Sequence, residues 1–548
     1  MPMTHFARRS RLAAAGLAVG IAMALPPSLP AQTAADLHRM PVVPPALLVR
    51  PLTLRTGIGV AHDAVSTAQP DAQRFCDQGL SYLHNYVWTE AARSFNEALR
   101  LDPQLPTAYV GLSLALTGLN QRAAARRAFE AAQALTPRSA HEQQHRTVRE
   151  RQIAAEEAPG DPARLALYRQ ALDNALATFP DDVEFWLQRG VAEAADAGDR
   201  GQSSPPSAVP FFMKALALSP DHFAAHHYLT HAYENGGRIQ DALSHGAAYA
   251  RLAPNVPHAR HMYGHDLRRV GRIRDAILEF EAADRLEQAY FAAEHVAPDI
   301  DWHHEHNLDL LGTSYQYTGQ MRRAASLLEK AFGLPTSNLV QAVNKRQWPA
   351  FLRASGDHER ALTAARTLAA HPNAVVQAIG QIEAAHALID AGKMNEAATA
   401  SNAALAILRR GEPGSALAGP EMQLLQGEFF LRTAQRAKGV DTLMKALAAA
   451  MSAPGPDEWA QALFTLESVA RAARGAGDWE MASRVAQLMM KHDAAYAGSH
   501  YATALVAQQA GNRVAARGAF QKALDLWAQA DADLPAVVDA RRRLAALR

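Results

Sequence analysis

Residues spaced 34 positions apart repeat the same small, aromatic or helix-ending type along most of the chain. After Gly79, the residues Ala91, Phe95, Ala98 and Pro103 recur at that spacing as Ala125, Phe129, Ala132 and Pro137. A glycine followed five residues later by an alanine also recurs, 34 residues apart at Gly237/Ala242 and Gly271/Ala276 and at longer spacings at Gly319/Ala324, Gly356/Ala361, Gly392/Ala397 and Gly511/Ala516. A small residue at a fixed place lets two antiparallel helices approach closely, glycine makes the turn between them, and proline ends the second helix. The pattern therefore predicts a stack of helix pairs.

This pattern resembles the tetratricopeptide repeat (TPR) family, whose units are helix pairs of 34 residues. The resemblance implies an all-α superhelical solenoid, and we expect two sub-arrays, at residues 71–348 and 349–548. Residues 32–70 contain five prolines and no helical period, which is typical of a linker or a loosely docked arm. Residues 199–210 are rich in Gly, Ser and Pro and are predicted to form a loop inside one repeat.

The composition excludes several classes of function. Lys+Arg 55 against Asp+Glu 54 leaves a net charge of +1, so nothing in the charge balance favours nucleic acid as a partner. The single cysteine, Cys76, excludes an internal disulfide framework, a four-thiolate zinc site and covalent c-type haem. Cys76 lies on the first helix of a predicted repeat, where we expect it to be packed rather than nucleophilic.

Residues 1–31 have the features of a cleaved signal peptide. Arg8, Arg9 and Arg11 precede the apolar or glycine stretch 12–25, and prolines follow before Ala31. The Arg8-Arg9 pair is also compatible with a twin-arginine signal. No later run of apolar residues is long enough to span a membrane. We therefore expect a periplasmic or secreted mature protein without a membrane span.

Histidines are concentrated where two repeats carry them at the same places. Of the 23 histidines, 12 fall between positions 222 and 306. His227 and His231 occupy the fifth and ninth places of one unit, and His261 and His265 occupy the same places of the next unit. Residues four apart lie on one helix face, so each pair can chelate a metal ion. Neighbouring first helices lie about 10 Å apart, which predicts that the two pairs converge.

The TPR resemblance implies that the second, fifth, ninth and twelfth places of each unit face the concave groove. It thereby adds His258, His306, Glu234 and Asp309 to the groove. The local strings also resemble a recurring bacterial TPR subgroup, through DQGL at 77–80, HYLTHAYE at 227–234, HARHMYGH at 258–265 and EHN at 305–307. This chain has Asp309 where that subgroup has a further histidine, and the resemblance names no reaction.

Three functions are compatible with these residues. The first is an exported binding or scaffold protein whose histidine-lined groove coordinates Zn, Cu, Fe, Ni or Mn. The second is a hydrolytic or oxidative metalloenzyme at the same histidines, with Glu234 or Asp309 as the base or an extra ligand. The third is a metal-free adaptor that binds a protein or peptide in the concave groove.

A second motif, H-E-x-x-H, occurs at 141–145, where a histidine pair holds zinc and a glutamate acts as base in metalloproteases. The neighbouring residues Arg146, Arg149, Glu150 and Arg151 instead predict a charged, solvated helix. We therefore expect no metalloprotease site at His141 and His145.

Overall fold

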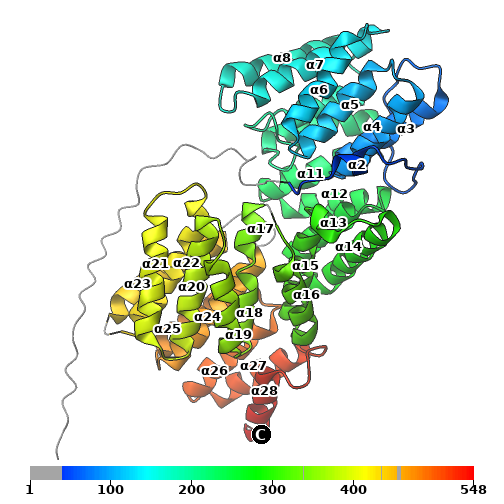
Figure 1. Cartoon of the computed structure of the whole chain (residues 1–548). Helices are drawn as coiled ribbons and strands as arrows, with labels where there is room; N and C mark the ends of the chain where they lie inside the picture. The colour runs from blue at the N-terminus through cyan, green and yellow to red at the C-terminus, as the bar shows by residue number, and fades with distance from the viewer. Residues whose placement is uncertain (1–39, 337, 434, 453–457, 548) are drawn as a thin grey trace, which may run out of the picture.

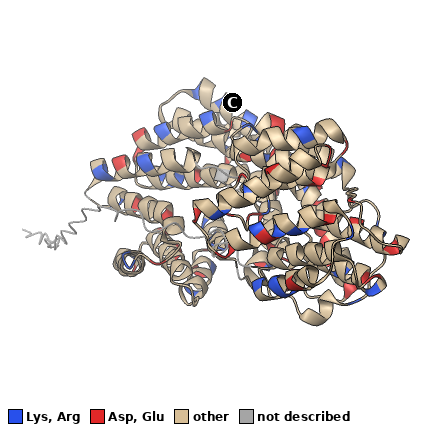
Figure 2. Ribbon diagram, turned by 90° about the horizontal axis from the view of Figure 1, so that it is seen from above, with Lys and Arg blue, Asp and Glu red and all other residues tan. Residues whose placement is uncertain are grey.

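The computed structural model describes residues 40–336, 338–433, 435–452 and 458–547, and within these ranges the regular structure is helical (Figure 1). The predicted signal peptide, residues 1–31, lies outside the described residues. None of the described helices combines the length and the apolar character that crossing a membrane requires. Acidic and basic residues are interspersed along the helices (Figure 2).

The first array runs from α3 to α16 and follows a short helix, α2, in the arm. Its helices are α2 (Pro45–Leu48), α3 (Pro70–His84), α4 (Trp88–Leu101), α5 (Pro106–Gly118), α6 (Arg122–Ala134), α7 (Ala140–Glu156), α8 (Pro162–Thr178), α9 (Val183–Val191), α10 (Val209–Leu218), α11 (Phe223–Asn235), α12 (Ile239–Leu252), α13 (Pro257–Arg269), α14 (Ile273–Glu294), α15 (His304–Tyr317) and α16 (Met321–Gly333). Two 3-10 turns, η1 (Pro206–Ala208) and η2 (Pro298–Ile300), precede α10 and α15. The loop predicted at 199–210 connects α9 to α10.

We refer to the helices from α17 to α28 as the second array. Its helices are α17 (Leu339–Asn344), α18 (Gln347–Ala354), α19 (His358–Ala369), α20 (Ala374–Asp390), α21 (Met394–Leu408), α22 (Gly419–Leu431), α23 (Arg436–Ser452), α24 (Glu458–Gly475), α25 (Trp479–His492), α26 (Ala497–Gln509), α27 (Arg513–Leu526) and α28 (Pro535–Ala546), with a 3-10 turn η3 (Ser415–Ala418) before α22. Consecutive helices pack against each other, as in a solenoid. Because α17 and the start of α18 precede the boundary predicted at residue 348, the division into two sub-arrays stays a prediction.

The repeating residues perform the packing roles that their spacing predicts. Gly237 and Gly271 have φ angles of +71° and +79° in the turns before α12 and α14, a backbone conformation that favours glycine. Ala242 and Ala276 are fully buried where the two helices of each unit meet. Gly79 is different: it lies inside α3, where an added Cβ would lie 2.7 Å from Phe95 Cζ, and so it serves close helix packing rather than a turn.

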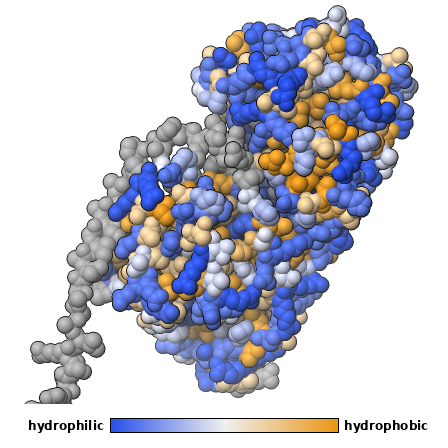
Figure 3. All heavy atoms as spheres, in the orientation of Figure 1, coloured by the Kyte–Doolittle hydropathy of each residue, from blue (hydrophilic) through white to orange (hydrophobic). Residues whose placement is uncertain are grey.

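The arm, residues 40–69, is docked on the first array. Val43, Leu47, Leu48 and Ala61 are buried against α3 and α4 and belong to the same hydrophobic core. Valines of the arm also remain on the surface, namely Val42, Val49 and Val60. Figure 3 shows apolar residues gathered on the upper part of the molecule, where the arm and α2 lie in Figure 1.

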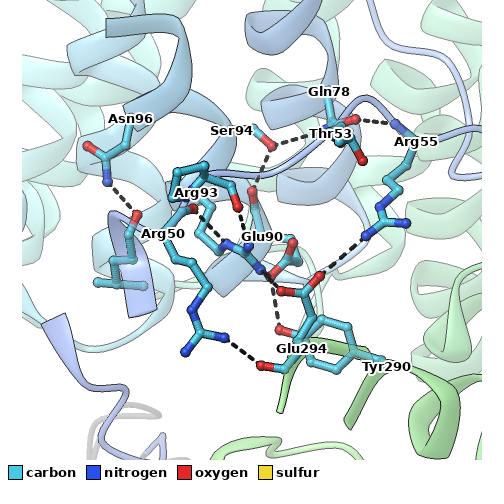
Figure 4. A network of polar contacts seen from close by, with 12 residues as sticks. Arg50, Thr53, Arg55, Gln78, Glu90, Arg93, Ser94, Asn96, Tyr290 and Glu294 are labelled. Carbon is cyan, nitrogen blue, oxygen red and sulfur yellow. Dashed lines mark hydrogen bonds and ion pairs between the residues drawn. The ribbon is translucent and has the colours of Figure 1, made fainter. Parts of the chain in front are cut away.

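A buried arginine joins the arm to both α4 and α14 (Figure 4). Arg93, which is 1% exposed, donates to the carbonyl oxygens of Arg50 and Pro51 at 3.2 and 2.9 Å. It also pairs with Glu90 at 2.7 Å and with Glu294, at the end of α14, at 2.9 Å. One guanidinium thus satisfies two carboxylates and two backbone groups, and it ties three segments together.

The C-terminal end of the second array returns to the last unit of the first. The backbone N–H of Asp531 donates to the carbonyl oxygen of Gly319 at 3.0 Å, in the turn between α15 and α16. Arg322 pairs with Asp533 at 2.6 Å, and Tyr317 on α15 donates to Asp493 at 2.6 Å. The second array is therefore held to the first at the sequence junction and again through its last helices.

Candidate metal centre

The repeat register places the predicted histidines on the first helices of three successive units. His227 and His231 lie on α11, His258, His261 and His265 on α13, and His306 on α15. The structure divides these six residues into two trios, His227–His231–His258 and His261–His265–His306. Within each trio one nitrogen per ring lies within 4.8 Å of the others. The two i, i+4 pairs therefore do not form one four-histidine centre. Each pair lies beside a third histidine, His258 for the first pair and His306 for the second.

In the first trio three Nε2 atoms face one another. His227 Nε2 lies 3.0 Å from His258 Nε2 and 3.1 Å from His231 Nε2. The Nδ1–H of His227 donates to the carbonyl oxygen of His84 at 2.6 Å, so its Nε2 carries a single lone pair. One lone pair cannot accept a good hydrogen bond from two rings at once. A metal ion between the rings would instead use one lone pair from each ring. Because zinc–nitrogen bonds are about 2.0–2.1 Å long, nitrogen ligands in tetrahedral zinc sites lie about 3.3 Å apart, which is close to the spacing seen here.

The residue that orients His227 is itself held in place. His84 Nε2–H donates to Glu184 Oε2 at 2.8 Å, and His84 Nδ1 lies 2.8 Å from the hydroxyl oxygen of Tyr228. Tyr86 covers the trio, with ring centroids 4.5 Å from His227 and 5.1 Å from His258. Tyr86 lies in the turn between α3 and α4 and has a φ of +59°. This backbone conformation is strained for an aromatic residue.

The second trio has its own orienting partner. The Nδ1–H of His261 donates to Asn307 Oδ1 at 3.0 Å, and Asn307 Nδ2 donates to the carbonyl oxygen of Phe280 at 3.0 Å. His261 and His265 have ring centroids 4.3 Å apart, and His261 and His306 have centroids 4.9 Å apart. The hydrogen bond to Asn307 leaves His261 Nε2 as a lone-pair donor, which is the arrangement that metal-binding histidines use.

A seventh histidine, which the sequence reasoning missed, lies between the trios. The His303 ring centroid is 5.2 Å from His258 and 4.2 Å from His261. His303 Nδ1–H donates to Glu287 Oε1 at 2.6 Å, whereas His303 Nε2 is buried and has no hydrogen-bond partner among the described residues. His303 precedes α15 and so stands outside the 34-residue grid. The run His303-His304-Glu305-His306 in the sequence was the available signal.

Burial keeps the imidazoles of five of the six trio histidines neutral. Desolvation lowers the pKa of His231 to about 4. Desolvation, followed by the neighbouring histidines, also holds the pKa values of His227, His258, His261 and His265 well below the ordinary histidine value. Neutral imidazoles have the free lone pairs that a metal ion needs.

Of the two predicted carboxylate candidates, Glu234 lies near the second trio, with Oε1 3.9 Å from His265 Nδ1. Asp309 is buried on α15, the helix that carries His306. Burial and the adjacent Glu234 raise the pKa of Asp266 well above the usual value, so the Glu234–Asp266 pair retains a proton. Neither Glu234 nor Asp309 belongs to the two nitrogen trios.

A cavity of about 380 Å³ adjoins the histidines. Its wall includes His258 and His303 together with the aromatic residues Tyr86, Trp88, Tyr290 and Trp302. A small organic molecule in this cavity would contact two of the seven histidines. Most ligand sites share this combination of an apolar wall and a few polar groups.

The prediction of a solvated helix at 141–151 is wrong for one face of α7. Glu142, His145 and Arg149 are 2%, 6% and 1% exposed, because α7 packs on α5 and α8 and Arg149 pairs with Glu156 at 2.8 Å. Glu142 still has no role as a base. Its two carboxylate oxygens accept from the backbone N–H groups of Ser66 and Arg138 at 3.1 and 2.7 Å.

Cys76 is buried, and its burial raises the pKa of its thiol well above the usual value. It therefore remains a packed thiol and not a nucleophile.

No protein-family model and no curated protein sequence matches the chain. Several solved structures are similar to it. The apo form of the quorum sensor NprR from B. thuringiensis has 12% identity and a TM-score of 0.40, over 70% of this chain and 97% of that one. A tetratricopeptide repeat protein from Parabacteroides merdae has 12% identity and a TM-score of 0.35, over 51% and 99%. The APC/C Cut9–Hcn1 hetero-tetramer has 13% identity and a TM-score of 0.30, over 87% and 97%.

At these identities and scores the neighbours indicate nothing about function. The paired helices with their 34-residue register themselves give the chain a TPR-like, all-α solenoid fold. The narrower resemblance to the histidine-containing subgroup stays a prediction.

Proposed function

We propose that this protein is an exported TPR-like scaffold that binds transition-metal ions at its two histidine trios. The observation that carries the proposal is the convergence of the Nε2 atoms of His227, His231 and His258. The one lone pair on His227 Nε2 faces both other rings and cannot accept a good hydrogen bond from each. All-imidazole ligands suit Zn, Cu, Ni or Fe better than Mn, which prefers oxygen ligands. Three protein ligands leave a coordination position open in each trio.

Metal analysis of the purified, untagged mature protein tests this proposal. We expect the variant His231→Ala/His258→Ala and the variant His265→Ala/His306→Ala each to lose one metal equivalent. The control is His226→Ala/His245→Ala, which removes another close histidine pair, with Nδ1 atoms 2.8 Å apart on α11 and α12, and leaves both trios intact. Metal content that is equal in all three variants and the parent would refute the proposal.

The cavity beside His258 and His303 favours a second function, catalysis at the same ions. A metalloenzyme needs an open coordination position and a pocket that limits water. With Co²⁺ in the trios, we expect azide to shift the visible absorption of the cobalt protein. Ala289→Trp, which fills the cavity from α14, should block a bulkier ligand such as imidazole and not azide. No spectral response to either ligand would exclude open coordination and leave a binding role.

A metal-free adaptor remains the alternative that these measurements would favour if the parent protein carries no metal. The partner would then be a protein or peptide in the concave groove, found by its co-purification with the parent. Export is a separate part of the proposal and rests on residues 1–31. Cell fractionation of a full-length chain, compared with a chain in which Arg8 and Arg9 are replaced by Gln, tests it: export that persists only with the arginine pair supports a twin-arginine signal.

A further inference from the structure

Four side chains from three separate segments meet at the start of α7. Asp63 comes from the arm, His141 and His145 from the first turns of α7, and Asp182 from the residue before α9. One ligand atom from each lies within 4.8 Å of all the others. None of these four residues belongs to the histidine trios.

Three of the four separations within this group are close to those between ligands on one ion, and the fourth, between His141 and Asp182, is a short hydrogen bond. His145 Nε2 lies 3.0 Å from Asp63 Oδ2 and 3.3 Å from His141 Nε2. His141 Nε2 lies 3.5 Å from Asp63 Oδ1 and 2.5 Å from Asp182 Oδ2. Ligands on a tetrahedral zinc ion lie about 3.3 Å apart when their bonds are about 2.0–2.2 Å long. Two nitrogens and two carboxylate oxygens are also a complete set for a closed zinc site.

The surrounding residues hold the four side chains in these positions. Phe185 stacks on His145 with ring centroids 4.3 Å apart, and Asp182 Oδ1 accepts from the backbone N–H of Phe185 at 2.9 Å. On the arm, the carbonyl oxygen of Asp63 accepts from Gln73 at 2.9 Å, and Ser66 N–H donates to Glu142. The arm is therefore fixed on both sides of the Asp63 side chain before any ion binds.

We propose that Asp63, His141, His145 and Asp182 form a zinc site that fastens the N-terminal arm to the repeat array. The charge of the two carboxylates is one that a divalent cation neutralises. Asp63 and His145 are 7% and 6% exposed, whereas His141 and Asp182 keep side-chain exposures of 20% and 12% and give the ion a way in. The H-E-x-x-H string thus supplies two ligands, while its glutamate holds the arm backbone.

The test uses the full mature chain loaded with zinc alone. Asp63→Asn and His141→Gln keep each side chain polar and close to its original size, and both should lose one zinc equivalent. The matched control is Asp71→Asn, which alters another aspartate, 3.1 Å from Arg74 and outside the group, and should lose none. Chelation should speed protease cleavage within residues 40–69 of the parent and of the control, and should have no further effect in Asp63→Asn.

Two results would overturn the proposal. One is an unchanged zinc content in both ligand variants, which would leave the group as two histidines hydrogen-bonded to two aspartates. The other is arm cleavage that does not respond to chelation. Because the variants of the two trios keep this site intact, a failure here and a failure of the trio proposal give different patterns of zinc loss.

Discussion

Glu287 and His303 are joined by a hydrogen bond of 2.6 Å between Oε1 and Nδ1–H, and this bond fixes the histidine that lies between the two trios. The other oxygen of Glu287 accepts from His304 Nδ1–H at 2.7 Å. Burial raises the pKa of Glu287, but the hydrogen bonds from both histidines outweigh burial and bring it below the usual value. Glu287 is thus an ionised, fully buried carboxylate that determines which nitrogen of His303 is free.

Glu287→Gln is expected to weaken metal binding without removing a ligand. An amide has one acceptor oxygen, so it can orient only one of His303 and His304, and a displaced His303 would disturb the rings of His258 and His261 that it contacts. Because neither His303 nor His304 belongs to a trio, we expect a loss at the lower end of the about 10–100-fold in metal affinity that removal of a ligand's own orienting partner costs. Metal titration in competition with a chromogenic chelator measures the change. Glu279→Gln on the same helix, where the carboxylate only pairs with Arg260 at 3.2 Å, should leave the affinity unchanged. Equal affinities for both variants would contradict the role of Glu287.

Arg93→Met is expected to destabilise the protein and to release the arm. The change leaves the carboxylates of Glu90 and Glu294 and two arm carbonyl groups without their shared donor, and breaking one side of a buried ion pair costs about 3–5 kcal/mol. Urea unfolding measures the free energy, and limited proteolysis within residues 40–69 reports the arm. Arg100→Met, which removes the solvent-exposed partner of Glu97, should cost far less. Similar losses in the two variants would disprove the argument.

Gly380→Ala should destabilise the second array by about 1–3 kcal/mol, because overpacking forces two helices apart. A Cβ at Gly380 on α20 would lie 2.7 Å from the Cα of Ala369, a backbone atom at the end of α19 that cannot move aside. Gly518→Ala is the matched opposite. It lies exposed within α27 with no atom near the added Cβ, and should stabilise by roughly 0.5–1 kcal/mol. Thermal unfolding should show a lower melting temperature for Gly380→Ala and a higher one for Gly518→Ala.

Acid should destabilise the second array through Glu428. Despite its burial, which raises the pKa, hydrogen bonding from His386 at 2.8 Å and the charge of Arg353 lower the pKa of Glu428 to about 2. Because the folded pKa is depressed, the stabilisation is complete above the ordinary glutamate value of about 4.3 and is lost as the pH falls from there to about 2. The loss is roughly 3 kcal/mol. Urea unfolding in a chelator at several pH values should show a steeper loss of stability in the parent than in Glu428→Gln, which lacks this contribution.

The repeat pattern of the sequence predicted the site residues that lie within the repeats. The 34-residue register was sufficient to place the histidines of α11 and α13 on one face, because the helix positions repeat. It could not place His303, Asp63 or Asp182, because these residues stand in segments without a period and reach the site through packing between distant parts of the chain. The charged residues around Arg149 also led to a wrong prediction of a solvated helix. Arg149 is buried, because its guanidinium binds Glu156, Ser113 and Thr117.

The return of the C-terminal helices to the turn at Gly319 changes how this solenoid can lose its structure. In an open repeat array each unit contacts only its neighbours in sequence, so the last unit unravels first and independently. Here the last helices bond to the α15–α16 turn, and Asp493 bonds to Tyr317 on the helix that carries His306. The terminal repeats cannot fray alone, and any loosening of them reaches a helix of the candidate metal centre directly.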